Sequence, residues 1–455
     1  MLNLPVEFKE KYQRLLGDSQ AKAFFDALNK ENKKAFRINT LKPNQVSYDL
    51  SKKVPEISNA YYGEVNGQDP EWVSGTVYSQ DPSAMFPAFI ANVKQGDHVL
   101  DLCAAPGGKS TALAEKLNGS GVLVANEISS GRAKALRENI ERWGIKNAVI
   151  TNESPANLFP HFTQYFDEIL VDAPCSGEGM FRKNPEAIKY WSQDYVLTCQ
   201  ERQKEILTEA VKMLKPNGQL IYSTCTFSPE EDEEIVSWLV ETYNMKIVPI
   251  ELASDKISHG KNEWGSVSGL DHTLRFWPQD GLGEGQFAAI LQMPDGKIAK
   301  VKKRKIKKGD RSTRRLTKND QKLVEKVLDK FNLNFDWTAA VVRNDHVFLP
   351  AIDKDLKGLK IVNNGLELGI MKKNRFEPSH QLAEVLGELP QEDVIDLENQ
   401  DNYLSYLHGE TVRVDSKKLK GFVLVSFKGL IFSFGKAANG TLKNFYPKGL
   451  RILKK

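Results

Sequence analysis

Residues 98–110 read HVLDLCAAPGGKS, a strand-like run that passes through a glycine turn into the start of a helix. Glycines at such a turn permit unusual backbone angles and let a ligand approach the exposed amides of the helix N-terminus. This stretch therefore predicts a nucleotide-type cofactor site at the end of a strand.

Strand-like and helix-like runs alternate around this stretch, from about residue 95 to residue 295. Strands are expected at 98–103, 121–127, 147–152, 166–172 and 219–225, with a late strand at 286–293. Helices are expected at 109–117, 131–143, 194–214 and 229–241. Repeated β–α units form parallel sheets with helices on both faces, so the pattern predicts a doubly wound α/β fold.

The glycine turn differs from the loops that bind phosphates. A P-loop needs a glycine five residues before its last glycine, and that position here is Cys103. Glu127, at the end of the next expected strand, stands where a carboxylate binds ribose hydroxyls. A nucleoside without phosphates fits this combination, which predicts S-adenosylmethionine as the cofactor. The alternatives are a P-loop nucleotide hydrolase and a plain helix-starting turn with a surface glutamate.

Two cysteines follow strand-like runs at the same edge of the expected sheet. Cys175 lies in Asp-Ala-Pro-Cys at 172–175, and Cys225 lies in Ser-Thr-Cys-Thr at 223–226. Ligands of open α/β sheets bind at the carboxyl ends of the strands, so both thiols are expected at the reaction centre. Enzymes that methylate exocyclic amines place an aromatic residue at the end of the first tetrapeptide to stack the base, and this chain has none.

Paired thiols suit a harder reaction, methylation at carbon-5 of a pyrimidine. A thiolate that adds to carbon-6 turns carbon-5 into an enamine-like nucleophile, and the thiol must later leave by β-elimination. The attacking cysteine needs a lowered pKa, and an acid, for which Asp172 is placed, must hold the N3 and amino edge of the cytosine. On the residues alone, Cys175 and Cys225 are nearly equal candidates for the nucleophile.

With these motifs the chain resembles the RNA (cytosine-5) methyltransferases of the Nop/Sun type, and more closely the bacterial RsmF-like rRNA enzymes. The matching segments are Val77–Met85, Cys103–Ser110, Ala125–Glu127, Asp172–Lys183, Tyr222–Asp232, Arg275–Pro278, Gly283–Phe287 and Arg375–His380. The resemblance implies a class I S-adenosylmethionine-dependent methyltransferase that modifies cytosine in RNA, with 16S rRNA as the expected substrate. A tRNA substrate and a non-catalytic RNA-binding protein with the same fold are alternatives.

The resemblance also implies roles for individual residues. Cys225 is expected to attack carbon-6, Cys175 to help release the product, and Lys183 to lie near the target nucleotide. The expected cofactor contacts come from the glycine turn and the following strand ends: Cys103, Ala104, Ala105, Pro106, Gly107, Gly108, Lys109, Glu127, Arg132, Glu153 and Asp172. Relatives often carry an aspartate after the third strand, and here Asn152 or Glu153 takes that place.

The 455 residues are too many for one core at ~100–200 residues a domain. The expected division is an N-terminal α+β RNA-binding unit, a catalytic unit, a basic linker, a first C-terminal α+β unit and a PUA-like RNA-binding unit, at 1–93, 94–295, 296–316, 317–390 and 391–455. The first unit should contain helices at 7–16 and 20–28 and a half-exposed strand at 34–42. A helix at 317–331 and short strands at 347–349, 360–362, 411–414, 422–425 and 430–434 are expected in the last two.

Positive charge is concentrated in the linker, although the net charge of the chain is only +4. The basic residues between 300 and 318 include Lys302, Lys303, Arg304, Lys305, Lys307, Lys308, Arg311, Arg314 and Arg315, against one acid, Asp310. Such clusters bind polyanions, while a solvated tether is the alternative. The stretch therefore favours RNA as a partner.

The apolar segments, the N-terminus and the cysteines indicate where the protein is located and which kinds of site it lacks. No apolar run approaches the ~20 residues that span a bilayer, and the N-terminus has no signal-peptide pattern, so a cytoplasmic protein without membrane contact is expected. The four cysteines form no C-x-x-C pair and have no histidine at ligand spacing, so neither a disulfide scaffold nor a metal site is expected. Cys199 is expected to pack inside a helix, and the chain is expected to be a monomer.

Overall fold

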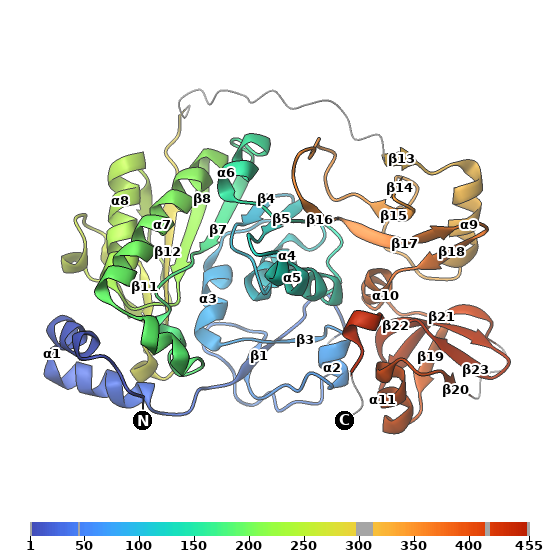
Figure 1. The fold of residues 1–455 in the computed structure, drawn as a ribbon, viewed down its shortest axis with the longest axis horizontal. Helices are drawn as coiled ribbons and strands as arrows, with labels where there is room; N and C mark the ends of the chain where they lie inside the picture. Colours follow the sequence, from blue (N-terminus) through green and yellow to red (C-terminus); the bar gives the residue numbers. More distant parts are fainter. Residues whose placement is uncertain (1, 44–45, 297–312, 415–418, 453–455) are drawn as a thin grey trace.

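The computed structural model describes residues 2–43, 46–296, 313–414 and 419–452, and its largest sheet runs through the middle of the molecule (Figure 1). Five neighbouring strands of this sheet are parallel, in the order β8-β7-β4-β5-β6. They span Leu214–Thr224 (β8), Phe166–Asp172 (β7), His98–Asp101 (β4), Val122–Asn126 (β5) and Ala148–Thr151 (β6). This centre confirms the predicted doubly wound fold.

The two edges of the same sheet are antiparallel, so the sheet as a whole is mixed. On one side, β12 (Gln286–Gln292) pairs with β8. Both β9 (Lys246–Val248) and β11 (Leu274–Phe276) pair with β12, and β10 (Ser258–His259) pairs with β11. On the other side, β16 (Ile361–Asn364) pairs antiparallel with β6. The sequence predicted a strand near 360, but not that it would leave its own unit to join the catalytic sheet.

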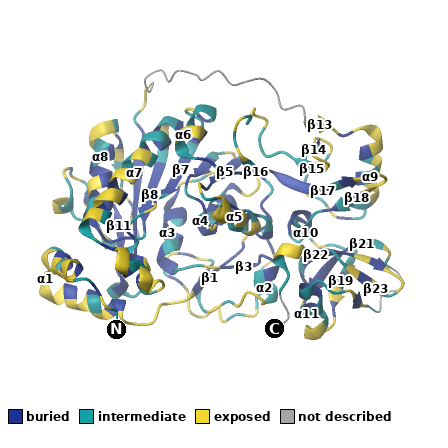
Figure 2. Ribbon diagram, viewed as in Figure 1, coloured by how far each residue is buried: buried dark blue, intermediate teal, exposed yellow. Residues whose placement is uncertain are grey.

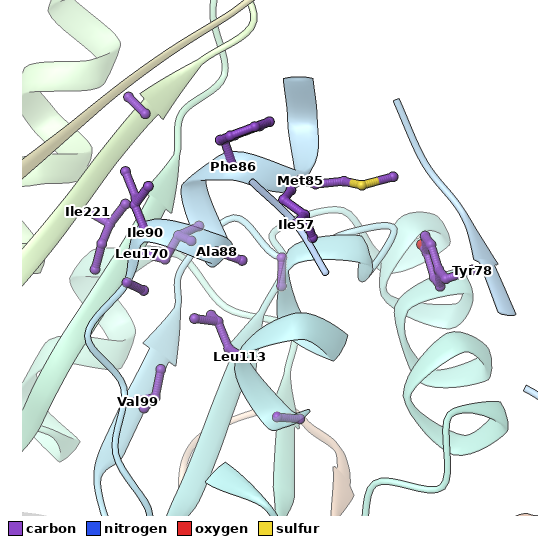
Figure 3. Close-up of a cluster of buried hydrophobic side chains, with 14 of the residues drawn as sticks. Ile57, Tyr78, Met85, Phe86, Ala88, Ile90, Val99, Leu113, Leu170 and Ile221 are labelled. Carbon is purple, nitrogen blue, oxygen red and sulfur yellow. The ribbon is translucent and has the colours of Figure 1, made fainter. Parts of the chain in front are cut away.

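Helices cover both faces of this sheet, as Figure 1 shows. Those on one face are α3 (Pro82–Ile90), α4 (Gly108–Leu117) and α5 (Ser130–Arg142), and those on the other are α6 (Pro155–Leu158), α7 (Gln193–Met213) and α8 (Glu233–Tyr243). Successive strand residues point to opposite faces, so Val99 belongs to the buried cluster that includes Leu113 on the first face (Figure 3), while Leu100 packs on the second. Both faces are buried, which is why the middle residues of these strands, such as Val99 and Leu100, are apolar on either face.

The N-terminal unit consists of helix α1 and a small sheet. Helix α1 (Val6–Leu28) is kinked at Gly17, whose φ of 74° is non-helical, so the two predicted helices are present as its halves. The sheet has the order β2-β1-β3, with strands at Ala60–Tyr62, Ala35–Ile38 and Val77–Ser79, and α2 (Pro70–Val73) precedes β3.

The prediction that the strand near 34–42 is half exposed was wrong, because all four residues of β1 are buried. Arg37 donates hydrogen bonds to the Gly108 carbonyl oxygen at 2.9 Å and to the Thr111 hydroxyl at 2.7 Å. Its guanidinium also pairs with Glu115. The polar face of the strand therefore points at helix α4 and holds the start of that helix in place.

Two smaller sheets form the C-terminal part (Figure 1). The first has the order β13-β14-β15-β17-β18 and spans Thr313–Arg315, Val341–Arg343, His346–Leu349, Leu366–Lys372 and Arg375–Pro378, with helices α9 (Lys318–Leu328) and α10 (His380–Leu386). The second has the order β19-β21-β22-β23-β20 and spans Val394–Leu397, Gly421–Phe427, Leu430–Ala438, Thr441–Asn444 and Val412–Arg413, with helix α11 (Gln400–His408). The predicted helix and short strands of this region are therefore present.

The N-terminal, catalytic and C-terminal parts are in close contact through buried residues such as Lys42 and Glu384, and helix α10 is largely dark blue in Figure 2. The ammonium of Lys42 lies 2.7 Å from Glu384 of α10 and 3.1 Å from the Arg142 carbonyl oxygen at the end of α5. Burial raises the pKa of Glu384 to about 7, against the opposing effect of Lys42. One lysine thus joins the N-terminal, catalytic and first C-terminal units.

Most of the predicted basic linker, residues 297–312, lies outside the described residues. Of its cations, the described Arg314 and Arg315 are exposed, and Arg314 pairs with Asp320. Within the described part of the chain, no helix is both long and apolar enough to cross a membrane. The predicted domain boundaries stay a prediction, and β16, which lies within 317–390, pairs with a strand of the unit at 94–295.

Candidate active site

The glycine turn lies at the carboxyl end of β4, where it begins helix α4. Gly107 has a φ of 118°, a conformation in the left-handed region that favours glycine. Side chains of α5 hold the turn from outside: Arg132 donates to the Ala105 carbonyl oxygen at 2.6 Å, and Asn139 donates to that of Pro106 at 2.8 Å. The predicted cofactor turn is thus braced by the next helix.

Asp101, the last residue of β4, is a site residue that the sequence reasoning missed. One carboxylate oxygen accepts a hydrogen bond from the Ser110 hydroxyl at 2.6 Å, while the buried Oδ1 has no partner among the described residues. Burial raises the pKa of this carboxyl group to about 7. An unpaired buried acceptor beside the turn fits an amino group of a ligand, such as that of S-adenosylmethionine.

Glu127 directly follows β5, and residues of the next loop and helix hold its carboxylate. Its carboxylate accepts from the Ser129 amide at 2.8 Å and lies 3.5 Å from Arg132. Asn152 donates to the Glu127 carbonyl oxygen at 2.7 Å. Both carboxylate oxygens of Glu153 accept hydrogen bonds within the protein. One accepts from the backbone amide of Lys360 at 2.7 Å, and the other accepts from the side-chain amide of Asn157 at 3.1 Å. A cofactor contact by Glu153 stays a prediction.

Asp172, at the end of β7, lies at the centre of a polar cluster. Its carboxylate accepts from Lys109 at 2.7 Å, from Ser223 at 2.8 Å and from Gln286 at 3.0 Å. Burial alone would lower the pKa of Lys109, but Asp172, Cys225 and Asp101 together raise it. Lys109 is therefore an ammonium that faces both the aspartate and the Cys225 thiol.

The two cysteines are brought together from the ends of β7 and β8. The sulfur atoms of Cys175 and Cys225 lie 3.4 Å apart, and neither is in a disulfide. The hydrogen bond with Cys225 and burial raise the pKa of Cys175 well above its ordinary value, and Glu231 adds to the effect. Cys175 is thus held as a neutral thiol beside the second sulfur.

The neighbouring basic residues at 182 and 183 differ in their surroundings. Lys183 is 30% exposed, and its ammonium lies 3.5 Å from Asp81. The side chain of Arg182 is 8% exposed, pairs with Glu284 at 2.6 Å and donates to the Gly283 carbonyl oxygen. Arg182 is therefore held by contacts within the protein, whereas Lys183 keeps an accessible ammonium.

Comparison with known proteins identifies the family. The family described as 16S rRNA methyltransferase RsmB/F matches residues 88–292. The N-terminal domain of RsmF matches 4–82, the RsmF first C-terminal domain 326–386 and the RsmF PUA domain 394–452. Ribosomal RNA small subunit methyltransferase F of Vibrio vulnificus is 31% identical over 470 residues, which cover 98% of this chain and 97% of the relative. The chain belongs to the RsmB/F family.

Other relatives agree with this membership. Ribosomal RNA small subunit methyltransferase F of Psychromonas ingrahamii is 29% identical over 98% of the chain and 97% of its own length. A methyltransferase homologue from Pyrococcus horikoshii has a TM-score of 0.55 at 27% identity, over 64% of this chain and 96% of that one. NSun6 from Pyrococcus horikoshii shares the fold, with a TM-score of 0.53 at 21% identity, over 64% of this chain and 99% of that one.

Membership in the RsmB/F family confirms the class I methyltransferase fold, the S-adenosylmethionine cofactor and the RNA (cytosine-5) methyltransferase activity that the sequence predicted. The P-loop hydrolase and the non-catalytic RNA-binding protein are thereby excluded. The cytoplasmic location and the monomeric state stay predictions.

Two buried glutamates hold the cysteine loops of this RsmB/F chain, and the sequence reasoning missed both. Glu231 accepts from the Ser176 amide at 2.9 Å and from Gln203 at 2.9 Å. Glu178 accepts from Trp191 at 2.7 Å and from the Phe227 amide at 3.0 Å, and it also pairs with the Tyr12 hydroxyl. Both lie within matched segments, but a sequence does not show which carboxylates point inward.

The other cysteines take no part in this thiol pair. Burial raises the pKa of Cys103 above its ordinary range, so its thiol stays neutral. Cys199 is fully buried in α7, as predicted, and burial raises its pKa to about 11. Among the described residues, no group of histidine, cysteine and acidic side chains is arranged to hold a metal ion.

Proposed function

We propose that this protein transfers a methyl group from S-adenosylmethionine to carbon-5 of a cytosine in 16S rRNA, with Cys225 as the nucleophile and Cys175 as the group that assists release. The observation that carries this proposal is the pair of thiols, 3.4 Å apart, beside the Asp172–Lys109 ion pair. The relatives named for 16S or small-subunit rRNA support the choice of substrate.

The two thiols have different electrostatic surroundings, and this supports the assignment of their roles. The pKa of Lys109 is raised by Asp172, Cys225 and Asp101, so an ammonium lies within electrostatic reach of the Cys225 thiol. The hydrogen bond with Cys225, burial and Glu231 raise the pKa of Cys175, which favours its neutral form. The residue patterns alone left this choice open.

The reaction follows from these positions. Asp172, 29% exposed, accepts a hydrogen bond from the cytosine amino group and orients the ring over Cys225. The Cys225 thiolate bonds to carbon-6, which makes carbon-5 nucleophilic. S-adenosylmethionine supplies an electrophilic sulfonium methyl when bound. After transfer, the carbon-5 proton leaves to solvent, its bonding pair re-forms the double bond to carbon-6, and the pair of the carbon-6–sulfur bond leaves on Cys225 as a thiolate, which the Cys175 thiol 3.4 Å away stabilises by a hydrogen bond.

Trapping of the covalent intermediate tests these roles. We expect Cys175→Ala incubated with 16S rRNA and S-adenosylmethionine to accumulate a protein–RNA adduct that survives denaturing electrophoresis, because release is slowed more than attack. Cys199→Ala is the control, since that thiol lies inside α7, and it should behave as the wild type. The double variant Cys175→Ala/Cys225→Ala should form no adduct. An adduct with Cys225→Ala alone would reverse the two assignments.

The RNA target is tested in cells. We expect bisulfite sequencing of total RNA from a deletion strain to lose protection at one or more 16S rRNA cytosines, and a plasmid copy to restore it. A Cys225→Ala copy should not restore it. Loss of protection only in tRNA would replace 16S rRNA by tRNA as the substrate.

We also propose that the flanking units, including the PUA domain, supply affinity for RNA and choice of the target. The chemistry is carried by residues at the ends of β4, β7 and β8, within the catalytic unit. Chemistry on a base requires that the base be unstacked, so a single-stranded or looped target is expected.

A further inference from the structure

A cavity of about 380 Å³ lies between the catalytic unit and the first C-terminal unit, apart from the thiol pair. Its walls come from α5, β16 and the sheet β13–β14–β15, which lie side by side in Figure 1. The volume is within the usual range of small-ligand pockets. The mechanism above uses none of its residues.

One wall of the cavity is an aromatic platform. His346 and Phe348 are two residues apart on β15, so they share one face of the sheet, and their rings are stacked at 6.0 Å with an angle of 19°. Val342 and Val347 point to the opposite face, where they are buried in the core. Proteins that read single-stranded RNA stack bases on aromatic side chains of a sheet face in this way.

A buried amide lines the same cavity. Asn363 of β16 is 4% exposed, and its side chain donates to Gln381 at 3.3 Å, which fixes its orientation. Its side-chain oxygen Oδ1 is left without a hydrogen-bond partner among the described residues. Buried acceptors are rarely left unpaired, and the N–H groups of a nucleobase edge would satisfy this one.

Charged groups at the rim suit a phosphate. Arg137 of α5 and Arg343 of β14 line the cavity, with Glu367 as the acid among its lining residues. Glu367 holds Arg137 at 3.1 Å and the His346 ring at 2.5 Å, so it fixes the positions of both. Thr313, which lies within the basic stretch between residues 300 and 318, also lines the cavity.

From this combination we infer that the cavity is a second RNA subsite, which binds one unpaired nucleotide of the substrate away from the target cytosine. The base stacks on Phe348 and donates to Asn363, and the adjoining phosphate lies at Arg343. Because β16 is hydrogen-bonded to β6 of the catalytic sheet, a nucleotide held here has a fixed position relative to the thiols. The inference rests on the proposed function, since it concerns the same RNA.

Affinity measurements with matched variants test the subsite. The probe is in vitro transcribed 16S rRNA containing 4-thiouridine, bound to the full-length protein. We expect Phe348→Leu to weaken binding by roughly tenfold, since stacking of one base on an aromatic ring has about that effect. Phe335→Leu removes an aromatic ring packed on the same core but outside the cavity lining, and it should bind as the wild type.

A second variant covers the case in which Phe348→Leu is unstable in thermal unfolding. Arg343 is exposed, so Arg343→Gln should fold normally and reduce the magnitude of the slope of log affinity against log salt by about 0.7. Photocrosslinks from the wild type should map to β15 or β16 and be lost in Phe348→Leu. A free nucleotide monophosphate should compete only at concentrations far above that of the RNA.

Three results would overturn the inference: unchanged affinity in Phe348→Leu together with an unchanged slope in Arg343→Gln, crosslinks that avoid β15 and β16, or loss of the crosslinks to these strands when 30S subunits assembled with the same RNA replace the transcript. These results leave the proposed function standing, provided that the wild type methylates the same RNA. Absence of any RNA binding or methylation by the wild type would instead remove the proposed function.

Discussion

Cys225→Ala is expected to lower the rate of methyl transfer by at least ~10³-fold, because carbon-5 of cytosine is not nucleophilic without the covalent bond to sulfur. Affinity for S-adenosylmethionine should stay within about twofold, since Asp101, Glu127 and the turn at 103–109 lie at other strand ends. Transfer of radiolabelled methyl groups to 16S rRNA measures the rate, and calorimetry measures cofactor binding.

The control for this result is Cys199→Ala, which removes a thiol from the core of α7. It should retain the wild-type rate once any difference in the folded fraction is taken into account. A parallel loss of rate and of cofactor affinity in Cys225→Ala would place Cys225 in the cofactor site and refute its role as the nucleophile. Retention of activity would make Cys175 the attacking residue.

The parts of this site that could be predicted are those that a local pattern specifies. The strand, glycine turn and helix at 98–117 appear as β4, the turn at Gly107 and α4, because periodicity and glycine conformation are local properties. The positions of Cys175 and Cys225 followed from the rule that parallel strands carry their sites at the carboxyl ends. In the folded chain the sulfur atoms of these two residues, fifty positions apart in the sequence, lie 3.4 Å from each other.

The parts that could not be predicted depend on contacts between distant segments. Arg37 looked like the polar side of an exposed strand, yet it is buried because its partners are in α4. A short strand was predicted near Ile361, but nothing in its sequence indicated that it pairs with β6 of the catalytic sheet. Asp101 and Glu231 do not stand out among the many acidic residues of the sequence. Only the folded chain shows that Asp101 has an unpaired carboxylate oxygen and that Glu231 holds the Cys175 loop.

Arg275→Met is expected to destabilise the folded protein by about 3–5 kcal/mol, as removal of one partner from a buried ion pair generally does. Arg275 is 2% exposed and holds three acceptors of the Cys225 loop and α8. It donates to Glu233 at 2.7 Å and to the Phe227 carbonyl oxygen at 3.0 Å, and it lies 3.1 Å from Asp232. Denaturant unfolding of both proteins measures the difference.

The loss of folding stability in Arg275→Met should depend on pH. Burial raises the pKa of Asp232 well above its ordinary value even though Arg275 opposes the shift, so removal of Arg275 raises it further. The folded variant then keeps a proton that the unfolded chain releases above about pH 4, so its stability falls as the pH rises through the interval between these two pKa values. The wild type undergoes the same titration at a lower pKa, so the stability difference between the two proteins should be no smaller at pH 8 than at pH 5 and should grow once the pH exceeds the wild-type pKa of Asp232.

Arg375→Met is the matched control, because Arg375 is 64% exposed and pairs with Glu377 at 2.8 Å on the surface. An exposed pair contributes less than about 1 kcal/mol, so this variant should unfold nearly as the wild type at both pH values. Equal stabilities of Arg275→Met and Arg375→Met would show that the carboxylates of Asp232 and Glu233 find water or other donors when the guanidinium is removed. In that case Arg275 would not be what holds the Cys225 loop on α8.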